Sequence, residues 1–98
     1  MPNDNLELLK LLARRYIWWK PPGEAVREPR RVIAQVMNLG DWDDANAMRL
    51  RLGDAALQDA LTHAEAGQFN ARSWTWWHYR LGLARMGQVP PLPVRRFE

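Results

Sequence analysis

The stretch Ser73-Trp-Thr-Trp-Trp-His-Tyr-Arg-Leu-Gly-Leu83 holds three of the six tryptophans in this chain of 98 residues. Read as a helix, it carries apolar and aromatic residues on two faces, because both sets recur at intervals of three or four residues. The first face holds Trp74, Trp77, His78 and Leu81, and the second holds Trp76, Tyr79, Arg80 and Leu83. A helix that is apolar on two sides needs cover on two sides. We therefore expect this helix to lie at the centre of a small helical domain.

The rest of the chain shows helical spacing of apolar residues between residues that start or stop helices. Suitable starts are Asp4, Pro29, Asp41, Asp54 and Asn70, and suitable stops are Pro21-Pro22-Gly23, Gly40, Gly53, Gly67 and Gly87. These signals predict helices over about residues 4–19, 29–39, 41–52, 54–66 and 70–86, with a loop or short turn over 21–28. We therefore predict an all-α fold: a compact single-domain array of about five short helices over residues 1–87. Residues 88–98 are predicted to be an extended or disordered proline-rich tail, lying away from the helices.

Several shorter segments carry their own predictions of backbone conformation and packing. The run Tyr16-Ile-Trp-Trp19 has the composition of a strand as well as a helix, so an extended Trp18–Lys20 stays open. Gly40 is expected to adopt a positive φ at the end of its helix. Phe69 is expected to pack on Trp74 at the start of the last helix. The tryptophans divide into an expected core set (Trp42, Trp74, Trp77) and an expected partly exposed set (Trp18, Trp19, Trp76).

Composition narrows the class of protein. The chain has no cysteine, which excludes disulfides, thiolate metal sites and a cysteine nucleophile. Arg14, Arg15 and Lys20 interrupt the longest apolar runs, so we expect no segment that spans a membrane. The polar start Met1-Pro-Asn-Asp4 does not resemble a secretory signal. We therefore expect a cytoplasmic protein with no membrane partner.

The net charge of +3 hides a segregated pattern. Residues 1–31 hold seven basic and four acidic side chains, and residues 32–71 hold two basic and six acidic ones. Residues 72–98 hold five basic side chains, opposed by Glu98 alone. Such asymmetry is typical of proteins that bind nucleic acid or an acidic partner, and it also arises from ordinary solvated helix faces.

The two histidines form no recognisable catalytic or metal motif. Ser73 and Thr75 lie near His78 in the sequence, but no residue is placed to orient a triad. His63 and His78 lack the spacing of a two-histidine metal site. We interpret His78 as a packed, hydrogen-bonded aromatic residue. We expect no enzyme activity, no catalytic residue, no metal and no cofactor.

Residues 41–66, broken at Gly53, have the outline of a helix-turn-helix. The second of these helices carries Asp54, Asp59 and Glu65 and no basic residue, so DNA phosphates would repel it. If DNA is bound, the basic first helix or the C-terminal arm binds it. We expect such binding to be weak and indifferent to sequence.

A series of short motifs carries a family resemblance. The motifs are, in order, Ile17-Trp-Trp-Lys20, Val36-Met-Asn-Leu-Gly-Asp41, Leu52-Gly-Asp54, Phe69-Asn-Ala-Arg-Ser73, Trp76-Trp77 and Leu81-Gly-Leu83. This order resembles a small bacterial family of uncharacterised helical domains, over roughly residues 16–84. Members of that family are often encoded beside an abortive-infection-type nucleotidyltransferase toxin. The resemblance implies that the chain is the antitoxin partner of such a toxin.

Six tryptophans exceed what one small core needs, and tryptophan, tyrosine and arginine are enriched at protein interfaces. The tail can order on a partner, because its prolines stiffen it and reduce the entropy lost on docking. The residues predicted to bind a partner are Trp18, Trp19, Trp76, Arg80, Leu92, Arg95, Arg96 and Phe97. We therefore predict a non-enzymatic protein-interaction module, with a DNA-binding transcriptional regulator as the alternative. Its partner, on the resemblance, is a nucleotidyltransferase-type toxin.

Overall fold

The computed structural model describes the backbone of residues 3–94 and the side chains of residues 5–94. Within this part of the chain there are six helices and no strand, which confirms the predicted all-α fold. The helices are α1 (Asn3–Tyr16), α2 (Pro22–Ala25), α3 (Pro29–Leu39), α4 (Trp42–Leu52), α5 (Asp54–Thr62) and α6 (Ala71–Arg80). The added helix, α2, is a single turn that begins at Pro22, where the sequence predicts a loop or short turn.

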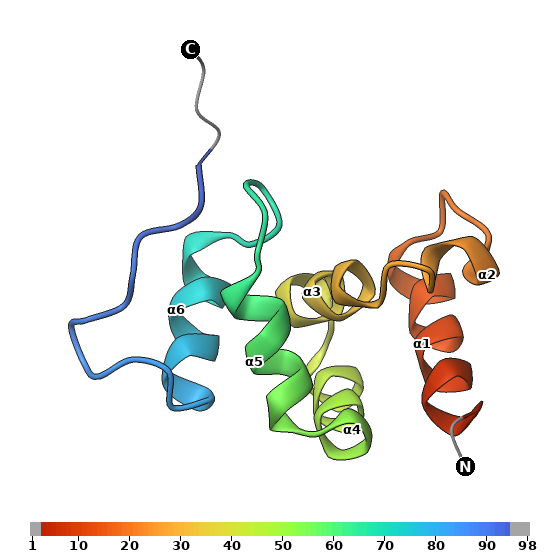
Figure 1. Cartoon of the computed structure of the whole chain (residues 1–98), viewed down its shortest axis with the longest axis horizontal. Coiled ribbons are helices and arrows are strands. Elements are labelled where there is room, and N and C mark those ends of the chain that lie inside the picture. The colour runs from red at the N-terminus through yellow and green to blue at the C-terminus, as the bar shows by residue number, and fades with distance from the viewer. Residues whose placement is uncertain (1–2, 95–98) are drawn as a thin grey trace.

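The central element is α3. It packs against all five other helices, whereas α6 packs against α3 and α5. Figure 1 shows α3 in the middle of the molecule, with α6 at one end and α1 and α2 at the other. The buried residues of α3 are Val32, Ile33, Ala34, Val36 and Met37. The central position predicted for the tryptophan-rich helix is therefore wrong, because only one face of α6 is covered.

The inner face of α6 is buried as its spacing predicts. Each of its four residues, Trp74, Trp77, His78 and Leu81, is at most 6% exposed. The indole Nε1 of Trp77 donates a hydrogen bond of 2.8 Å to the carbonyl oxygen of Met37, which fastens α6 to the end of α3. Phe69 packs on Trp74 as predicted, with ring centroids 5.7 Å apart. These contacts fix how α6 lies on the core and therefore which face it leaves exposed.

Helix α1 ends at Tyr16, three residues earlier than predicted. A helical hydrogen bond from Ile17 N to Ala13 O closes it, and Trp18 and Trp19 then form a turn. Contacts between elements accompany the early end, since the Gln35 side chain of α3 donates to the Tyr16 carbonyl oxygen at 3.2 Å and the Lys20 N–H turns back to that of Ile17. At the other end the helix begins at Asn3, so Asp4 lies within it rather than before it.

Helix α5 ends at Thr62, four residues before the predicted end. The sequence Ala64-Glu-Ala66 suits a helix, but tertiary contacts override that preference. Arg31 of α3 pairs with the Glu65 carboxylate at 3.4 Å, and the Gln68 side chain accepts the Glu65 N–H at 2.9 Å. Residues 63–70 therefore form a loop that leads into α6.

Helix α6 ends at Arg80, six residues before the predicted end. Gly82 adopts a φ of +71°, the left-handed conformation that glycine tolerates. The N–H of Leu83 donates to the carbonyl of His78, and the N–H of Gly82 donates to that of Tyr79. These two bonds are the Schellman arrangement, which satisfies the last carbonyls and turns the chain away from the axis.

The junction of α3 and α4 is set by Gly40 and Asp41. The Asp41 carboxylate accepts the N–H of Asp44 at 2.8 Å, so Asp41 caps α4 as predicted. Gly40 has a φ of −67°, so the predicted positive φ is wrong. The glycine is required there for lack of space, since a Cβ atom would lie 2.5 Å from the carbonyl oxygen of Val36.

Candidate protein-interaction surface

The outer face of α6 carries large aromatic side chains that do not pack into the core. Asn70 caps the helix by accepting the Ser73 N–H at 2.8 Å. Arg72, Trp76 and Tyr79 follow at i, i+4 and i+7, on the side opposite the buried residues. Trp76 is 44% exposed and Tyr79 is 41% exposed. The helix therefore presents two large aromatic rings and an arginine to solvent.

Trp42 joins this face from the start of α4. Its ring meets that of Trp76 edge to face, with centroids 5.8 Å apart, and Trp76 meets the buried Trp77 in the same way at 4.8 Å. Trp42 is 51% exposed, so its predicted place in the core is wrong. The physical reason is its position as the first residue after the Asp41 cap, at the rim of the α4 packing face.

A groove of about 390 Å³ lies beside these rings. Met37, Ala45 and the three tryptophans give it apolar walls, with Arg72 and Asp41 among its polar lining residues. We call the groove together with Tyr79 and Arg80 the α6 surface. The sequence predicts Trp76 and Arg80 as members of a binding surface, and the structure places them on one helix face. Trp42 and Arg72 were missed, although the spacing of Arg72 four residues before Trp76 was a usable signal.

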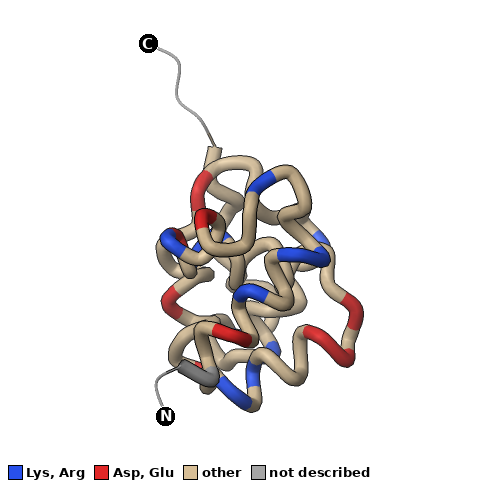
Figure 2. The backbone as a smooth tube through the Cα atoms, turned by 90° about the vertical axis from the view of Figure 1, so that its right-hand side faces the viewer, with Lys and Arg blue, Asp and Glu red and all other residues tan. Residues whose placement is uncertain are grey.

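Basic side chains outnumber acidic ones in the part of the chain that contains α6. Residues 5–71 hold nine basic and nine acidic side chains, whereas residues 72–94 hold three arginines and no acidic residue. Around α1 and α2, basic and acidic positions are interspersed along the backbone (Figure 2). Within residues 5–94, Arg72, Arg80 and Arg85 make no ion pair. The α6 end therefore carries unneutralised positive charge.

Acidic side chains in the middle of the chain form ion pairs within the molecule. Arg15 pairs with Asp44 at 2.7 Å and Arg30 pairs with Asp59 at 2.7 Å, so basic residues of the first third bind acidic residues of the middle. The Tyr16 hydroxyl also donates to Asp44 at 2.6 Å. This hydrogen bond, with Arg15 beside it, lowers the pKa of Asp44. These contacts account for much of the charge segregation without an external partner.

Trp18 and Trp19 lie in the turn between α1 and α2, at the opposite end of the molecule from α6 (Figure 1). They are 77% and 56% exposed, as predicted, and their rings meet edge to face with centroids 5.7 Å apart. Trp19 lines a separate hollow of about 510 Å³ with Glu28, Arg31 and Glu65. The structure therefore does not join these tryptophans to Trp76 and Arg80 in one surface.

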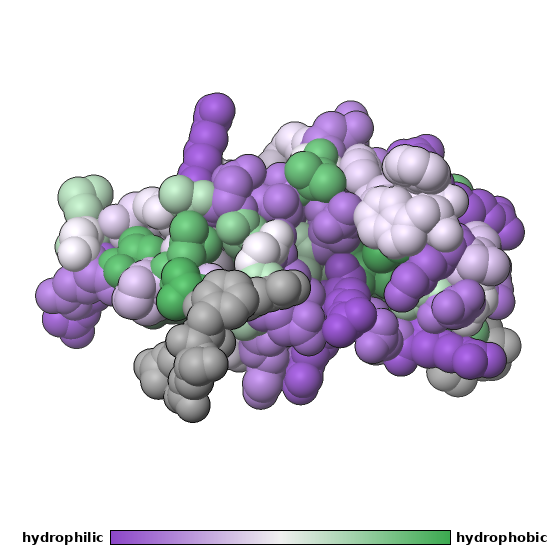
Figure 3. All heavy atoms as spheres, turned by 90° about the horizontal axis from the view of Figure 1, so that it is seen from above, coloured by the Kyte–Doolittle hydropathy of each residue, from purple (hydrophilic) through white to green (hydrophobic). Residues whose placement is uncertain are grey.

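The C-terminal segment follows α6 and lies against the core. The indole Nε1 of Trp74 donates to the carbonyl oxygen of Pro90 at 2.7 Å, and Val89 and Leu92 pack on the buried cluster. The expected distance of Leu92 from the helices is therefore wrong, and its role in partner binding stays a prediction. Seen from above, apolar residues gather at this end of the molecule (Figure 3). The predicted binding residues Arg95, Arg96 and Phe97 lie outside the described residues.

His78 is a packed core residue, as predicted. It is 4% exposed, its Nδ1 lies 2.8 Å from the carbonyl oxygen of Trp74, and its ring centroid lies 4.3 Å from that of Trp74. A buried ring held in this way has no open approach for a substrate. The residue contributes to the attachment of α6 rather than to a site.

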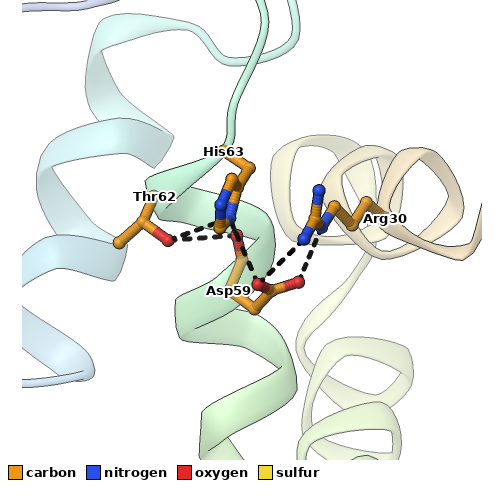
Figure 4. Close-up of polar contacts among 4 residues, drawn as sticks. All are labelled: Arg30, Asp59, Thr62 and His63. Atoms are coloured by element: carbon orange, nitrogen blue, oxygen red, sulfur yellow. Dashed lines mark hydrogen bonds and ion pairs between the residues drawn. The ribbon is translucent and has the colours of Figure 1, made fainter.

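A polar cluster joins the end of α5 to α3 and contains the other histidine (Figure 4). Arg30 Nε donates to Asp59 Oδ2 at 2.7 Å, and His63 Nδ1 lies 3.1 Å from Asp59 Oδ1. The Thr62 hydroxyl lies 3.3 Å from the same Nδ1. A histidine that activates a hydroxyl uses one ring nitrogen for the carboxylate and the other for the hydroxyl. Here the carboxylate and the hydroxyl both lie at Nδ1, so the cluster does not have that geometry. Its contacts join the end of α5 to α3, and Arg30 lowers the pKa of Asp59.

No protein-family model, curated protein or solved structure matches this chain. None of the described helices is both long and apolar enough to cross a membrane. Among residues 5–94, no three histidine, aspartate or glutamate side chains gather closely enough to hold a metal ion.

Proposed function

We propose that the protein is a non-enzymatic interaction module that docks a partner protein through its α6 surface. The observation that carries this proposal is the composition of the surface: Trp42, Trp76, Tyr79, Arg72 and Arg80 are exposed together, with one acidic residue, Asp41, at the groove. Tryptophan, tyrosine and arginine dominate the energetics of protein interfaces, whereas lysine and glutamate are depleted there.

The identity of the partner rests on the family resemblance. We propose that the module is an antitoxin that binds and restrains a nucleotidyltransferase-type toxin encoded beside it. A toxin of this class is expected to hold metal ions with active-site carboxylates, and an acidic cleft of that kind complements the arginines at the α6 end. This electrostatic match supports the pairing, because complementary potentials favour encounter and exclude wrong partners.

Duplex DNA is the less favoured ligand. The basic residues of the first third that face other elements, Arg15, Arg30 and Arg31, are engaged in ion pairs with Asp44, Asp59 and Glu65. DNA binding draws its affinity from basic groups available to neutralise phosphates. Within residues 5–94, a regulator that binds DNA would therefore have to use the basic side chains outside ion pairs, which are spread from the α1–α2 end to the α6 end: Arg14, Lys20, Arg27, Arg51, Arg72, Arg80 and Arg85.

Co-purification with the product of the adjacent reading frame tests the proposal. We expect the two proteins to co-elute from size-exclusion chromatography. Trp76→Ala should weaken the complex roughly 30-fold or more, as expected for a hot-spot residue. The control is Trp18→Ala, which removes a more exposed indole, 77% against 44%, from the opposite end. A complex lost with Trp18→Ala and kept with Trp76→Ala would move the interface to the α1–α2 end.

A further inference from the structure

We infer that the partner presents an acidic amphipathic segment to the α6 surface, with one apolar anchor between two carboxylates. This inference rests on the proposed function and specifies the chemistry of its partner. It is carried by the juxtaposition of an apolar groove with arginines that have no counter-ion within residues 5–94. The anchor fills the groove beside Trp42 and Trp76, and the carboxylates reach Arg72 and Arg80.

The groove suits an apolar side chain. Met37, Ala45, Trp42 and Trp76 line it, and Met37 and Ala45 are buried. The contact of Trp76 with both Trp42 and Trp77 holds its ring in place before anything binds. A preformed pocket of this kind costs little ordering entropy on association. A leucine or phenylalanine of the partner is the anchor that such walls fit.

Helix geometry sets the spacing of the charges. Arg72 and Arg80 lie four residues before and after Trp76, and a helix rises about 1.5 Å per residue. The two arginines therefore stand about 6 Å to either side of the tryptophan along the axis. A partner helix matches this spacing with acidic residues one turn before and one turn after its anchor. The predicted pattern is thus acidic residue, three others, apolar anchor, three others, acidic residue.

A nucleic acid fits the same surface less well. Single-strand binding uses aromatic rings with open faces on which bases stack. Trp76 is already engaged edge to face by two neighbouring indoles. Met37 and Ala45 also give the groove apolar walls, which suit an apolar side chain and offer no donor to a phosphate. These features favour a protein segment, so nucleic acid enters as an opposing outcome of the test.

The test uses the full chain and three synthetic 16-residue amphipathic peptides. The first repeats Glu-x-x-x-Leu-x-x-x-Glu, the second has Gln for each Glu, and the third has Lys for each Glu. Fluorescence anisotropy should show that the Glu peptide binds with a Kd of about 0.1 mM and the Gln peptide roughly five- to tenfold more weakly. Arg72→Glu should reverse the order, so that the Lys peptide binds best. Glutamate suits this position in the first turn of α6, so the variant is expected to fold.

Arg27→Glu is the matched control, because Arg27 is exposed, makes no ion pair within residues 5–94 and lies in the segment between α2 and α3. It should leave the preference for the Glu peptide unchanged. The inference is overturned if the Glu peptide does not bind, if the Gln peptide binds equally, or if a twelve-residue oligothymidylate binds more tightly than the Glu peptide. A complex with the neighbouring gene product that ignores Arg72→Glu would overturn this inference and leave the proposed function standing. Charge-dependent peptide binding without such a complex would support this inference and overturn the proposed function.

Discussion

Gly40 joins α3 to α4 with a φ of −67° and a ψ of 151°, angles that any L-residue adopts. A Cβ atom at this position would lie 2.5 Å from the carbonyl oxygen of Val36 and 2.9 Å from its Cγ1 atom. Both distances are shorter than van der Waals contact. The residue therefore has to be glycine because α4 leaves the end of α3 too closely for any side chain.

Gly40→Ala should lower the free energy of unfolding by about 1–3 kcal/mol, the usual cost of forcing an extra methyl group into a packed position. Gly23→Ala is the control, because a Cβ atom there meets nothing within 4 Å and the residue lies in a helix. That variant should be neutral or more stable by up to about 1 kcal/mol. Urea titration of both measures the difference. Equal effects of the two substitutions would contradict the steric account.

Trp77 is the residue on which the attachment of α6 depends most. It is 3% exposed and its indole satisfies the Met37 carbonyl oxygen. Trp77→Ala should cost about 3–5 kcal/mol of stability, as for other large aromatic truncations in a core. Trp18→Ala, at a position 77% exposed, should change stability by less than about 0.5 kcal/mol. Thermal melting compares them, and an unchanged midpoint for Trp77→Ala would show that α6 is dispensable for the fold.

The burial of single residues could be predicted from the sequence in some cases and not in others. Helical spacing was enough to predict that Trp77 and His78 are buried and that Trp76 is partly exposed. It failed for Trp42, whose place beside a capping residue puts the side chain at the rim of its helix. It failed for Gly40 as well, because the contact that requires glycine lies in how two helices meet rather than in local sequence.

Among the elements, α1 and α4 are joined by polar contacts centred on Asp44, in the first turn of α4. The carboxylate side chain is 14% exposed and accepts hydrogen bonds from Tyr16 at 2.6 Å and Arg15 at 2.7 Å. The Tyr16 hydroxyl in turn accepts the Asp41 N–H at 3.3 Å. The start of α4 is therefore tied to the end of α1 through one ionised group.

The pKa of Asp44 lies below its ordinary value, mainly because of the Tyr16 hydrogen bond and then because of Arg15. A lowered pKa in the folded state means that the stabilisation is present above the usual aspartate pKa near 4 and is lost as the pH falls through the lower value. Asp44→Asn should therefore cost about 1–2 kcal/mol at pH 7, and the cost should shrink at about pH 2.

Urea titrations at both pH values measure this change. Asp43→Asn is the control, since Asp43 lies in the same first turn of α4 and makes no ion pair within residues 5–94. It should have a small effect at both pH values. A cost for Asp44→Asn that is the same at pH 7 and pH 2 would contradict the role of the ionised carboxylate.

At this scale the sequence predicts the kind of element better than its extent or its place. All five expected helices begin within one residue of where we placed them, because caps and prolines are local signals. The ends of α1, α5 and α6 were placed too late, since contacts between elements and a Schellman turn stop them earlier. The central position of α3 has no local signal at all, because it follows from how six helices pack.

For the molecule as a whole, the C-terminal segment completes the core at the α6 end. Removing residues 88–98 would leave the Trp74 indole N–H without its acceptor and would uncover apolar surface now shielded by Val89 and Leu92. We therefore expect this truncation to lower the free energy of unfolding by about 1–3 kcal/mol. Truncation after residue 94 is the comparison, because it keeps Val89, Leu92 and the Pro90 acceptor in place. Thermal melting of both forms tests this, and an unchanged midpoint for the longer deletion would show that the contacts contribute nothing.

The segregated charge of the sequence is explained by the ion pairs that form in the folded molecule. The sequence shows basic ends around an acidic middle, but it cannot show that Asp44, Asp59 and Glu65 pair with arginines of the first third. Once these pairs are formed, the positive charge that remains in residues 72–94 lies beside the exposed aromatic rings of α6. The candidate surface follows from that coincidence of charge and aromatic exposure.

Amide hydrogen exchange of the complex with the neighbouring gene product shows where the partner docks. We expect slower exchange, relative to the free protein, in residues 71–87 and at the start of α4 around Trp42. Exchange in the Trp18–Trp19 turn and in α2 should be unchanged. A complex that protects the α1–α2 end and leaves residues 71–87 exchanging as in the free protein would contradict the assignment of the α6 surface as the docking site.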